Sequence, residues 1–143
     1  TAMMQTFAAA HPDRAGFVQS LGLRRYLSAM DCAALVAGNS SSGVVETPTF
    51  KVPTVNIGRR QAGRAICANV ICCDADEPAI EAALRMALSP AFAPVAAGAV
   101  SPYNGGETSE KICAVLAKFD FTRPKIFYDG PVPEFDPQRS VLV

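Results

Sequence analysis

The chain has 143 residues, half of them hydrophobic, which is enough to build the core of one domain. Thirteen basic residues balance thirteen acidic ones, so bulk charge gives no reason to expect binding to nucleic acid or to a membrane surface, and any anion site has to be local. No apolar run approaches the roughly 18 residues of a membrane span, and the N-terminus lacks the pattern of a signal peptide, which predicts a cytoplasmic protein.

The cysteines predict neither a disulfide framework nor a metal site. Their number is odd, no two of them form a C-x-x-C pair, and most lie in apolar runs. We therefore expect reduced thiols, buried as small core residues, and no metal. The five are Cys32, Cys67, Cys72, Cys73 and Cys113.

The first part of the chain predicts a helix, a short strand and a second helix. Residues 2–10 are good helix formers that stop before Pro12, because the position preceding a proline disfavours helical angles. Residues 17–20 are a strand candidate. In the second helix, apolar residues recur at helical spacing, and Arg24 and Arg25 fall on the solvent side of that stripe. The predicted buried face consists of Leu23, Tyr26, Leu27 and Met30.

A strand, a serine-rich turn, a short helix and a second strand form the centre of the chain. Residues 33–37 are a continuous apolar run, typical of a parallel strand buried on both faces. The serine turn, residues 38–43, follows it, and its serines can cap a helix that must be short because of Pro48. Since a helix start carries unpaired N–H groups and a partial positive charge, the arrangement predicts a phosphate site. Its residues are Ser40, Ser41, Ser42 and Gly43.

An acid and a basic loop follow the serine turn. Glu46 lies about one helical turn after the serines, within reach of the ribose of a nucleotide whose phosphates rest on the turn. A second strand, residues 52–57, leads into the arginine loop, residues 59–64, which holds three arginines and no acid. Because ligands of open α/β sheets bind outside the carboxyl ends of the strands, we expect this loop to bind an anion.

A further strand and helix complete the alternation of elements. Residues 70–73 are an apolar strand, and Pro78 fits the first turn of the next helix, with Asp74, Asp76 and Glu77 as capping acids. The predicted buried face of this helix consists of Ile80, Ala83, Leu84 and Ala87. Strands that alternate with helices predict a three-layer, Rossmann-like α/β fold with a parallel sheet.

The last part of the chain predicts one more helix and a tail. A turn at residues 104–106 leads to a helix capped by Thr108 or Ser109. Its inward residues are predicted to be Ile112, Val115, Leu116 and Phe119. We therefore place one Rossmann-like domain at residues 1–122 and a proline-rich C-terminal extension at residues 123–143.

The central stretch resembles a known enzyme family. GNSSSGVVETPTFKVPTVNIGRRQAGR, residues 38–64, is similar to the signature of the hydrolysing UDP-N-acetylglucosamine 2-epimerases, the NeuC-like enzymes of sialic-acid and capsule synthesis. The family's segment that leads into this motif resembles SLGLRRYLSAMDCAALVAGNS, and its NPYGDG-type turn resembles SPYNGGETSEKI. The resemblance implies the C-terminal half of a two-domain GT-B-type enzyme, with residues 1–122 as a partial, UDP-binding domain. It places Thr1 inside that half, so its first one or two strands and the N-terminal domain are expected outside this sequence.

The resemblance also implies roles for individual residues. The substrate-binding set is Ser40, Ser41, Ser42, Gly43, Glu46, Arg60 and Arg64. The serines would bind the diphosphate, Gly43 would leave room for it, and Glu46 would bind the ribose. Arg60 matches the family's UDP-binding arginine, whereas Arg59 replaces a variable position and is expected in solvent. Arg64 would bind phosphate or pair with an acid.

The implied reaction is loss of UDP from C1 of the sugar with removal of the C2 proton, followed by addition of water to the 2-acetamidoglucal to yield N-acetylmannosamine. No cofactor is implied. The acid and base are expected in the N-terminal domain, so this chain would contain no catalytic residue and would bind UDP weakly without activity. The sugar is N-acetylglucosamine or a diacetamido, bacillosamine-type relative. The implied partners are the UDP-sugar, the N-terminal domain and further copies in a homodimer or tetramer.

Two other functions share these features. A GT-B glycosyltransferase would have the same fold and diphosphate site, and a non-enzymatic sugar-nucleotide-binding module would lack acidic residues facing the cleft. A serine hydrolase is excluded, because its Gly-x-Ser-x-Gly elbow needs a glycine where this chain has Ser42. The one histidine, His11, lies beside Pro12 and is unsuited to act as a general base.

Overall fold

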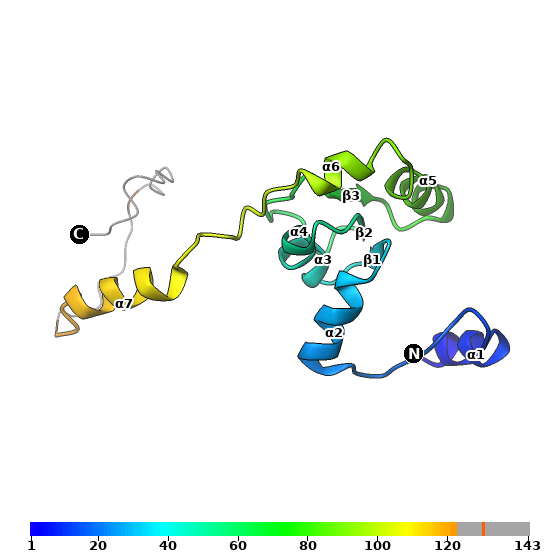
Figure 1. Ribbon diagram of the computed structural model, residues 1–143, viewed down its shortest axis with the longest axis horizontal. Coiled ribbons are helices and arrows are strands. Elements are labelled where there is room, and N and C mark those ends of the chain that lie inside the picture. Colours follow the sequence, from blue (N-terminus) through cyan, green and yellow to red (C-terminus); the bar gives the residue numbers. More distant parts are fainter. Residues whose placement is uncertain (123–129, 131–143) are drawn as a thin grey trace. The chain divides into compact units, whose positions relative to one another are not determined.

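The computed structural model describes residues 1–122 and Gly130. These residues belong to two compact units, one formed by residues 1–104 and the other beginning at Gly105. Figure 1 shows the elements along the chain; the predicted extension, residues 123–143, lies outside the described residues apart from Gly130. Among the described residues, none of the helices has the length and apolarity that a membrane crossing requires.

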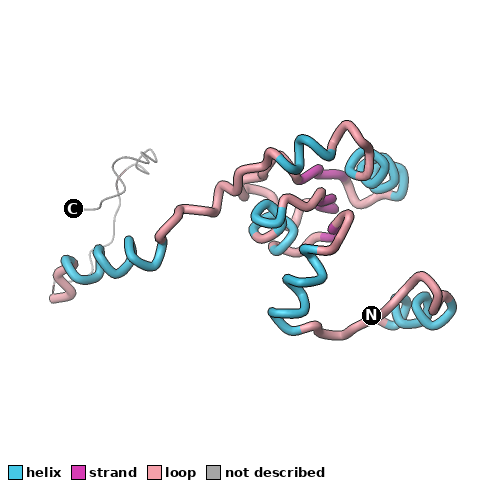
Figure 2. Tube along the Cα trace, in the orientation of Figure 1, coloured by secondary structure: helices cyan, strands magenta, loops and turns pink. Residues whose placement is uncertain are grey.

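Three parallel strands form the sheet of the first unit, namely β1 (Val36–Gly38), β2 (Thr54–Ile57) and β3 (Val70–Cys73). Their order is β1-β2-β3, and Gly38 is aligned with Asn56 across the first pair. Figure 2 shows the three strands side by side. The parallel sheet and the helices packed on it confirm the predicted α/β class and are consistent with a Rossmann-like fold, although a loop without a helix joins β2 to β3.

The first two predicted strands are wrong in extent or absent. Residues 17–20 form no strand, because no other described strand pairs with them. The apolar run at residues 33–37 contributes only two residues to β1, and Ala37 is exposed rather than buried. The reason is that β1 pairs with β2 alone among the described strands, so one edge stays open. An apolar run indicates that a segment can form a strand, but it does not show whether another strand is available to pair with it.

The described residues contain seven helices. The cap of α5 is as predicted, because the Asp76 carboxylate accepts a hydrogen bond from the Ala79 N–H at 3.0 Å and Pro78 lies in the first turn. Pro48 lies in the first turn of a second short helix, where its missing N–H costs nothing. The helices are α1 (Ala2–Ala10), α2 (Gly22–Asp31), α3 (Ser42–Val45), α4 (Thr47–Phe50), α5 (Glu77–Ala87), α6 (Ala93–Ala97) and α7 (Thr108–Lys118).

Helices cover both faces of the sheet. On one face, Ala83 and Ala87 of α5 pack against Val55 of β2 in the hydrophobic core. On the other face, the hydroxyl of Thr54 lies 2.8 Å from that of Thr47 in α4. Successive residues of a strand point to opposite faces, so Thr54 contacts α4 on one face of the sheet and Val55 contacts α5 on the other. The predicted inner face of α5 is confirmed as buried or half-buried at Ile80, Ala83, Leu84 and Ala87.

A buried polar network fixes α3 and α4 on the sheet. The Thr47 hydroxyl donates to the Gly43 carbonyl at 2.8 Å and lies 2.8 Å from the Thr54 hydroxyl. Asn69, which is fully buried, donates from Nδ2 to Thr47 Oγ1 at 3.2 Å and to the Val52 carbonyl at 2.8 Å. Because these groups are shielded from water, their hydrogen bonds are stronger than equivalent bonds on the surface.

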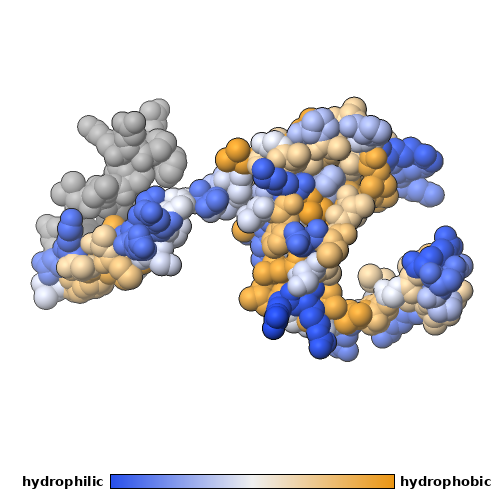
Figure 3. Space-filling view, viewed as in Figure 1, coloured by the Kyte–Doolittle hydropathy of each residue, from blue (hydrophilic) through white to orange (hydrophobic). Residues whose placement is uncertain are grey.

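Two predicted buried faces are partly or wholly exposed. On α2, Met30 is buried but Leu23 is 71% exposed, whereas Arg24 and Arg25 lie in solvent as predicted. On α7 the four residues predicted to point inward are all exposed, because α7 is the only helix described in its own unit, and Figure 3 shows hydrophobic residues on its surface. Its N-cap is Glu107, not a threonine or serine, and makes no side-chain cap bond. The exposed residues of α7 are Ile112, Val115, Leu116 and Phe119.

The cysteines are free thiols, but fewer of them are buried than predicted. Cys67 is buried and Cys73 is half-buried. Cys72 is exposed, since it faces away from the α5 side of the sheet. The other exposed thiols are Cys32 and Cys113.

Replacing Thr47 by valine should destabilise the first unit by about 1–3 kcal/mol, because the change preserves shape but leaves the Gly43 carbonyl and the Asn69 amide short of a partner. Thr49→Val on the exposed side of α4 is the matched control and should cost little. Urea unfolding followed by circular dichroism measures both. Equal midpoints for the two variants would contradict a stabilising role for the network.

Candidate functional site

Parallel pairing brings the serine turn and the arginine loop to one end of the sheet, the end at which the strands have their carboxyl termini. β1 ends at Gly38 and continues into the serine turn, and β2 ends at Ile57 and continues into the arginine loop. Since Gly38 is aligned with Asn56, the two segments leave the sheet at neighbouring points. Gly58, between β2 and the loop, has a φ of +74°, which glycine adopts without strain.

Two side chains of the arginine loop reach Asn39 in the serine turn. The Arg60 Nη1 atom lies 3.5 Å from both the backbone carbonyl and the side-chain Oδ1 of Asn39. The Gln61 Nε2 atom donates to the same carbonyl at 2.8 Å, and Gln61 is only 4% exposed. Arg60 is exposed and held by long bonds, so its guanidinium is available to an anion beside the serines.

The three serines have different surroundings. Ser40 Oγ accepts a hydrogen bond from the Ser42 N–H at 3.3 Å, and Ser41 is the N-cap of α3 without a side-chain cap bond. Both Ser40 and Ser41 are exposed. The Ser42 hydroxyl is half-buried and lies 2.5 Å from the hydroxyl of Tyr26 on α2. Ser40 and Ser41 therefore present hydroxyls to solvent, whereas Ser42 joins α2 to the turn.

Gly43 and Glu46 lie on the short helix and at its end. Gly43 is buried, and a Cβ atom there would approach Thr54 Cγ2 to 3.2 Å. This glycine therefore allows α3 to pack closely on β2, a reason that sequence reasoning missed. Glu46 is half-buried between α3 and α4, and its N–H donates to the Ser42 carbonyl at 3.0 Å, so it lies one helical turn after the serines.

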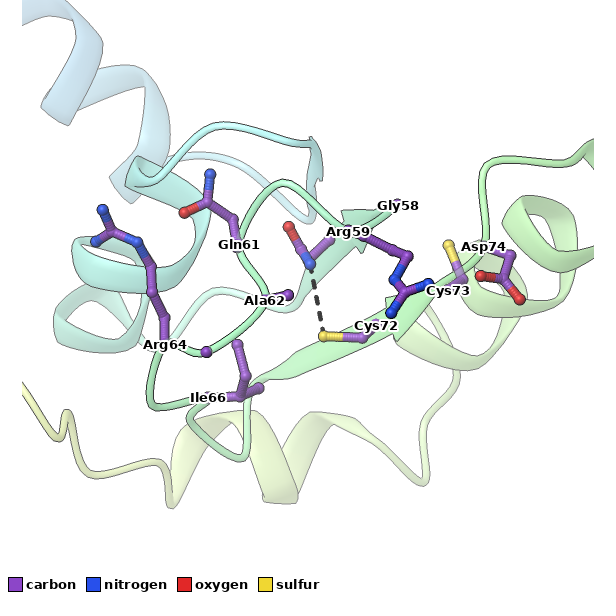
Figure 4. Close-up of a pocket in the computed structure, with 11 residues that line it drawn as sticks. Gly58, Arg59, Gln61, Ala62, Arg64, Ile66, Cys72, Cys73 and Asp74 are labelled. Carbon is purple, nitrogen blue, oxygen red and sulfur yellow. Dashed lines mark hydrogen bonds between the residues drawn. The ribbon is translucent and has the colours of Figure 1, made fainter.

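Arg59 and Arg64 line a different space from the one that Arg60 faces. Both border a cavity of about 350 Å³ between the arginine loop and the end of β3, together with Cys73 and Asp74. In Figure 4, Arg59 points toward Cys73 and Asp74, whereas Arg64 points away from them. Among the described residues, no acid lies within ion-pair distance of Arg64. Arg60 is not among the residues that border this cavity, so the three arginines of the loop do not all line one space.

The floor of this cavity contains a buried amide and two thiols. Asn56 Nδ2 donates to Cys72 Sγ at 3.6 Å, the dashed line in Figure 4, and Asn56 Oδ1 has no partner among the described residues. Burial, followed by the charges of Asp74 and Asp76 and then Cys72, raises the pKa of the Cys73 thiol. In the part of the chain that the structure describes, no cluster of three metal-ligating side chains is found.

Three contacts of the site were missed by sequence reasoning. Gln61 was within the quoted motif, but a polar residue in a basic loop gives no sign of burial. Tyr26 was predicted to be a core residue, and helical spacing cannot show that its hydroxyl reaches Ser42. Asn39 was treated as part of a turn, although its carbonyl is the meeting point of the two segments.

Comparison with known proteins gives one family. The family model described as UDP-N-acetylglucosamine 2-epimerase matches residues 1–117. The GDP/UDP-N,N'-diacetylbacillosamine 2-epimerase (hydrolyzing) of Campylobacter jejuni is 42% identical over 69 residues, which is 48% of this chain and 18% of the relative. Polysialic acid biosynthesis protein P7 of Escherichia coli is 33% identical over 120 residues, 80% of this chain and 30% of the relative.

A third relative is the UDP-N,N'-diacetylbacillosamine 2-epimerase (hydrolyzing) of Legionella pneumophila. It is 32% identical over 106 residues, which is 74% of this chain and 27% of the relative. The chain spans less than a third of the length of each of these three curated relatives.

In the folded protein, alkylation of Cys73 by iodoacetamide should reach half its maximal rate at a higher pH than in the urea-unfolded protein. The raised pKa keeps the thiol protonated, and the thiolate is the reacting form. Peptide mass spectrometry across about pH 7–10 measures the profile. Asp74→Asn should move the midpoint of the folded protein downward, since it removes a negative charge. Coincident profiles for the folded and unfolded protein would contradict this account.

Proposed function

The chain belongs to the UDP-N-acetylglucosamine 2-epimerase family, and on this basis we propose that it holds the nucleoside diphosphate leaving group of a hydrolysing 2-epimerase. The observation that carries the proposal is the approach of the Arg60 guanidinium to Asn39, directly before the exposed serines. A cationic group and hydroxyl donors on neighbouring segments can bind one diphosphate together. The names of two relatives, one described as a hydrolysing 2-epimerase of a GDP/UDP-sugar and the other of a UDP-sugar, support the reaction type.

The diphosphate contacts come from Ser40, Ser41 and Arg60. The two serines are exposed and have hydroxyls to donate, and Arg60 can turn from its long contacts with Asn39 onto phosphate oxygens. Each hydrogen bond to a charged group contributes about 1.5–3 kcal/mol. Ser42 acts indirectly, since its hydroxyl is bonded to Tyr26. Arg64 contributes at most a longer-range charge.

The nucleoside is oriented by Glu46. Its place one turn after Ser42, half-buried between two short helices, puts a carboxylate near the phosphate end of a bound nucleotide. A carboxylate accepts two hydrogen bonds from neighbouring ribose hydroxyls. Because ionised acceptors form stronger hydrogen bonds than neutral ones, this contact favours a ribonucleotide over a deoxy analogue.

In the proposed reaction, the bond between C1 of the sugar and the diphosphate oxygen breaks as a base removes the C2 proton, which gives a 2-acetamidoglucal and UDP. Water then adds across the double bond, with OH to C1 and H to C2, which gives free N-acetylmannosamine. Negative charge grows on the departing oxygen, and a prepositioned arginine and hydroxyls stabilise that charge in the transition state. This chain takes the place of the C-terminal domain of a GT-B enzyme, and the proton-transferring residues belong to the opposite domain.

Arg60→Ala in the full protein should weaken UDP binding about 10- to 100-fold, because it removes a charged bidentate donor. The effect on UMP should be smaller, since UMP lacks the second phosphate. Arg25→Ala, an exposed arginine of α2, is the control and should leave both affinities unchanged. Calorimetric titration measures all three proteins. If the parent and the Arg60 variant bound UDP tightly and equally, binding of the diphosphate by Arg60 would be excluded.

The products distinguish this function from its alternatives. Incubated in water with UDP-N-acetylglucosamine and, separately, with its diacetamidobacillosamine counterpart, the full protein should release UDP and a free 2-epimeric sugar from one of them. Transfer of the intact sugar to an acceptor would identify a glycosyltransferase. Binding of the nucleotide without any release of UDP would identify a non-enzymatic module.

Glu46→Gln should weaken binding of UDP about tenfold and leave binding of 2′,3′-dideoxy-UDP nearly unchanged, because only the first ligand offers hydroxyls to the carboxylate. Competition titration against one labelled nucleotide compares the two ligands in both proteins. An equal loss for both ligands would place Glu46 in support of the phosphates or of the fold rather than at the ribose.

A further inference from the structure

Gln61 is buried at the junction of the two segments, and no step of the proposed reaction uses it. Its Nε2 atom donates to the Asn39 carbonyl at 2.8 Å, although 22 residues separate the two in sequence. Its own backbone carbonyl accepts the Arg64 N–H at 3.2 Å, which closes the arginine loop on itself. One side chain therefore joins the loop to the serine turn at a short, well-formed hydrogen bond.

The neighbouring Arg60 cannot make this connection by itself. Its two contacts with Asn39 are both 3.5 Å long, at the outer limit for a hydrogen bond, and the side chain is exposed. Consecutive Cα atoms are fixed at about 3.8 Å, so anchoring Gln61 also anchors the backbone of Arg60. The guanidinium stays free to turn onto a ligand while its base remains in place.

The amide of Gln61 is oriented in a way that stability alone would not select. Only the Nε2 group can donate to a carbonyl, so the bond to Asn39 determines which end of the amide faces inward. Gln61 Oε1 is then buried, and it has no partner among the described residues. A buried carbonyl without a partner is destabilising, so the hydrogen bond to Asn39 is formed at a cost in stability at the other end of the same amide.

We propose that Gln61 is a positioning residue, whose hydrogen bond to the Asn39 carbonyl sets the separation at which Arg60 and the serines bind one diphosphate. The inference rests on the proposed function of the site. Gln61 does not touch the ligand and acts through Arg60. Its contribution to affinity therefore depends on the presence of the arginine.

A double-mutant cycle on the full protein tests this dependence. Gln61→Met keeps the length of the side chain and removes both the donor and the unpaired carbonyl. It should weaken UDP binding about fivefold in the parent background and less than about twofold in the Arg60→Ala background, because the second protein has no guanidinium to position. Gln19→Met, at an exposed glutamine, is the control and should change neither value. Thermal unfolding of each variant is measured in parallel.

A merely structural role would give a different pattern. Gln61→Met would then lower the unfolding midpoint and weaken binding equally in both backgrounds, which overturns the inference. Gln61→Asn, whose amide is one methylene too short to reach Asn39, provides a second variant and should reproduce the non-additive loss. If Arg60→Ala weakens UDP binding but neither Gln61 variant does, the inference fails and the proposed function stands. If the parent does not bind UDP, both fail.

Discussion

The parallel pairing of β1 with β2 is the constraint on which the rest of the site depends. Two strands that run in the same direction have their carboxyl termini at the same end of the sheet, so the segments that follow them are neighbours despite the intervening helices. Here those segments are the serine turn and the arginine loop. An antiparallel pair would have put the arginines at the far end of the sheet. The chemistry of the site is thus a consequence of strand direction before it is a consequence of any one side chain.

The serine turn is attached to its surroundings at three independent points. At the sheet, Thr47 connects the short helices that follow the turn to Thr54 and Asn69 by hydrogen bonds. From one side, Tyr26 on α2 holds the Ser42 hydroxyl. The third attachment is the hydrogen bond from the side-chain amide of Gln61, in the arginine loop, to the Asn39 carbonyl. Backbone held in this way keeps a constant shape, so the proposed function does not require Ser40 and Ser41 to become ordered when a diphosphate binds.

Much of the fold could be predicted from the sequence, and the failures share a physical cause. β3 and α5, with its Asp76 cap, follow from local patterns that the backbone itself can satisfy. The strand at residues 17–20 and the buried face of α7 were wrong, because both depend on partners that a local pattern cannot supply. The contacts of the site are harder still. Gln61 is buried by a bond across 22 residues, which composition and periodicity do not encode.

The close approach of α3 to β2 links two positions, Gly43 and Thr54, that lie on different elements of the fold. A methyl group at Gly43 would meet the Thr54 methyl group at 3.2 Å, tighter than ordinary contact. The hydroxyl of Thr54 is tied to Thr47, so the threonine cannot rotate away freely. Related proteins in which Gly43 has become alanine should therefore carry serine or another smaller residue at position 54. Their two codons would covary, for reasons of packing and irrespective of the ligand.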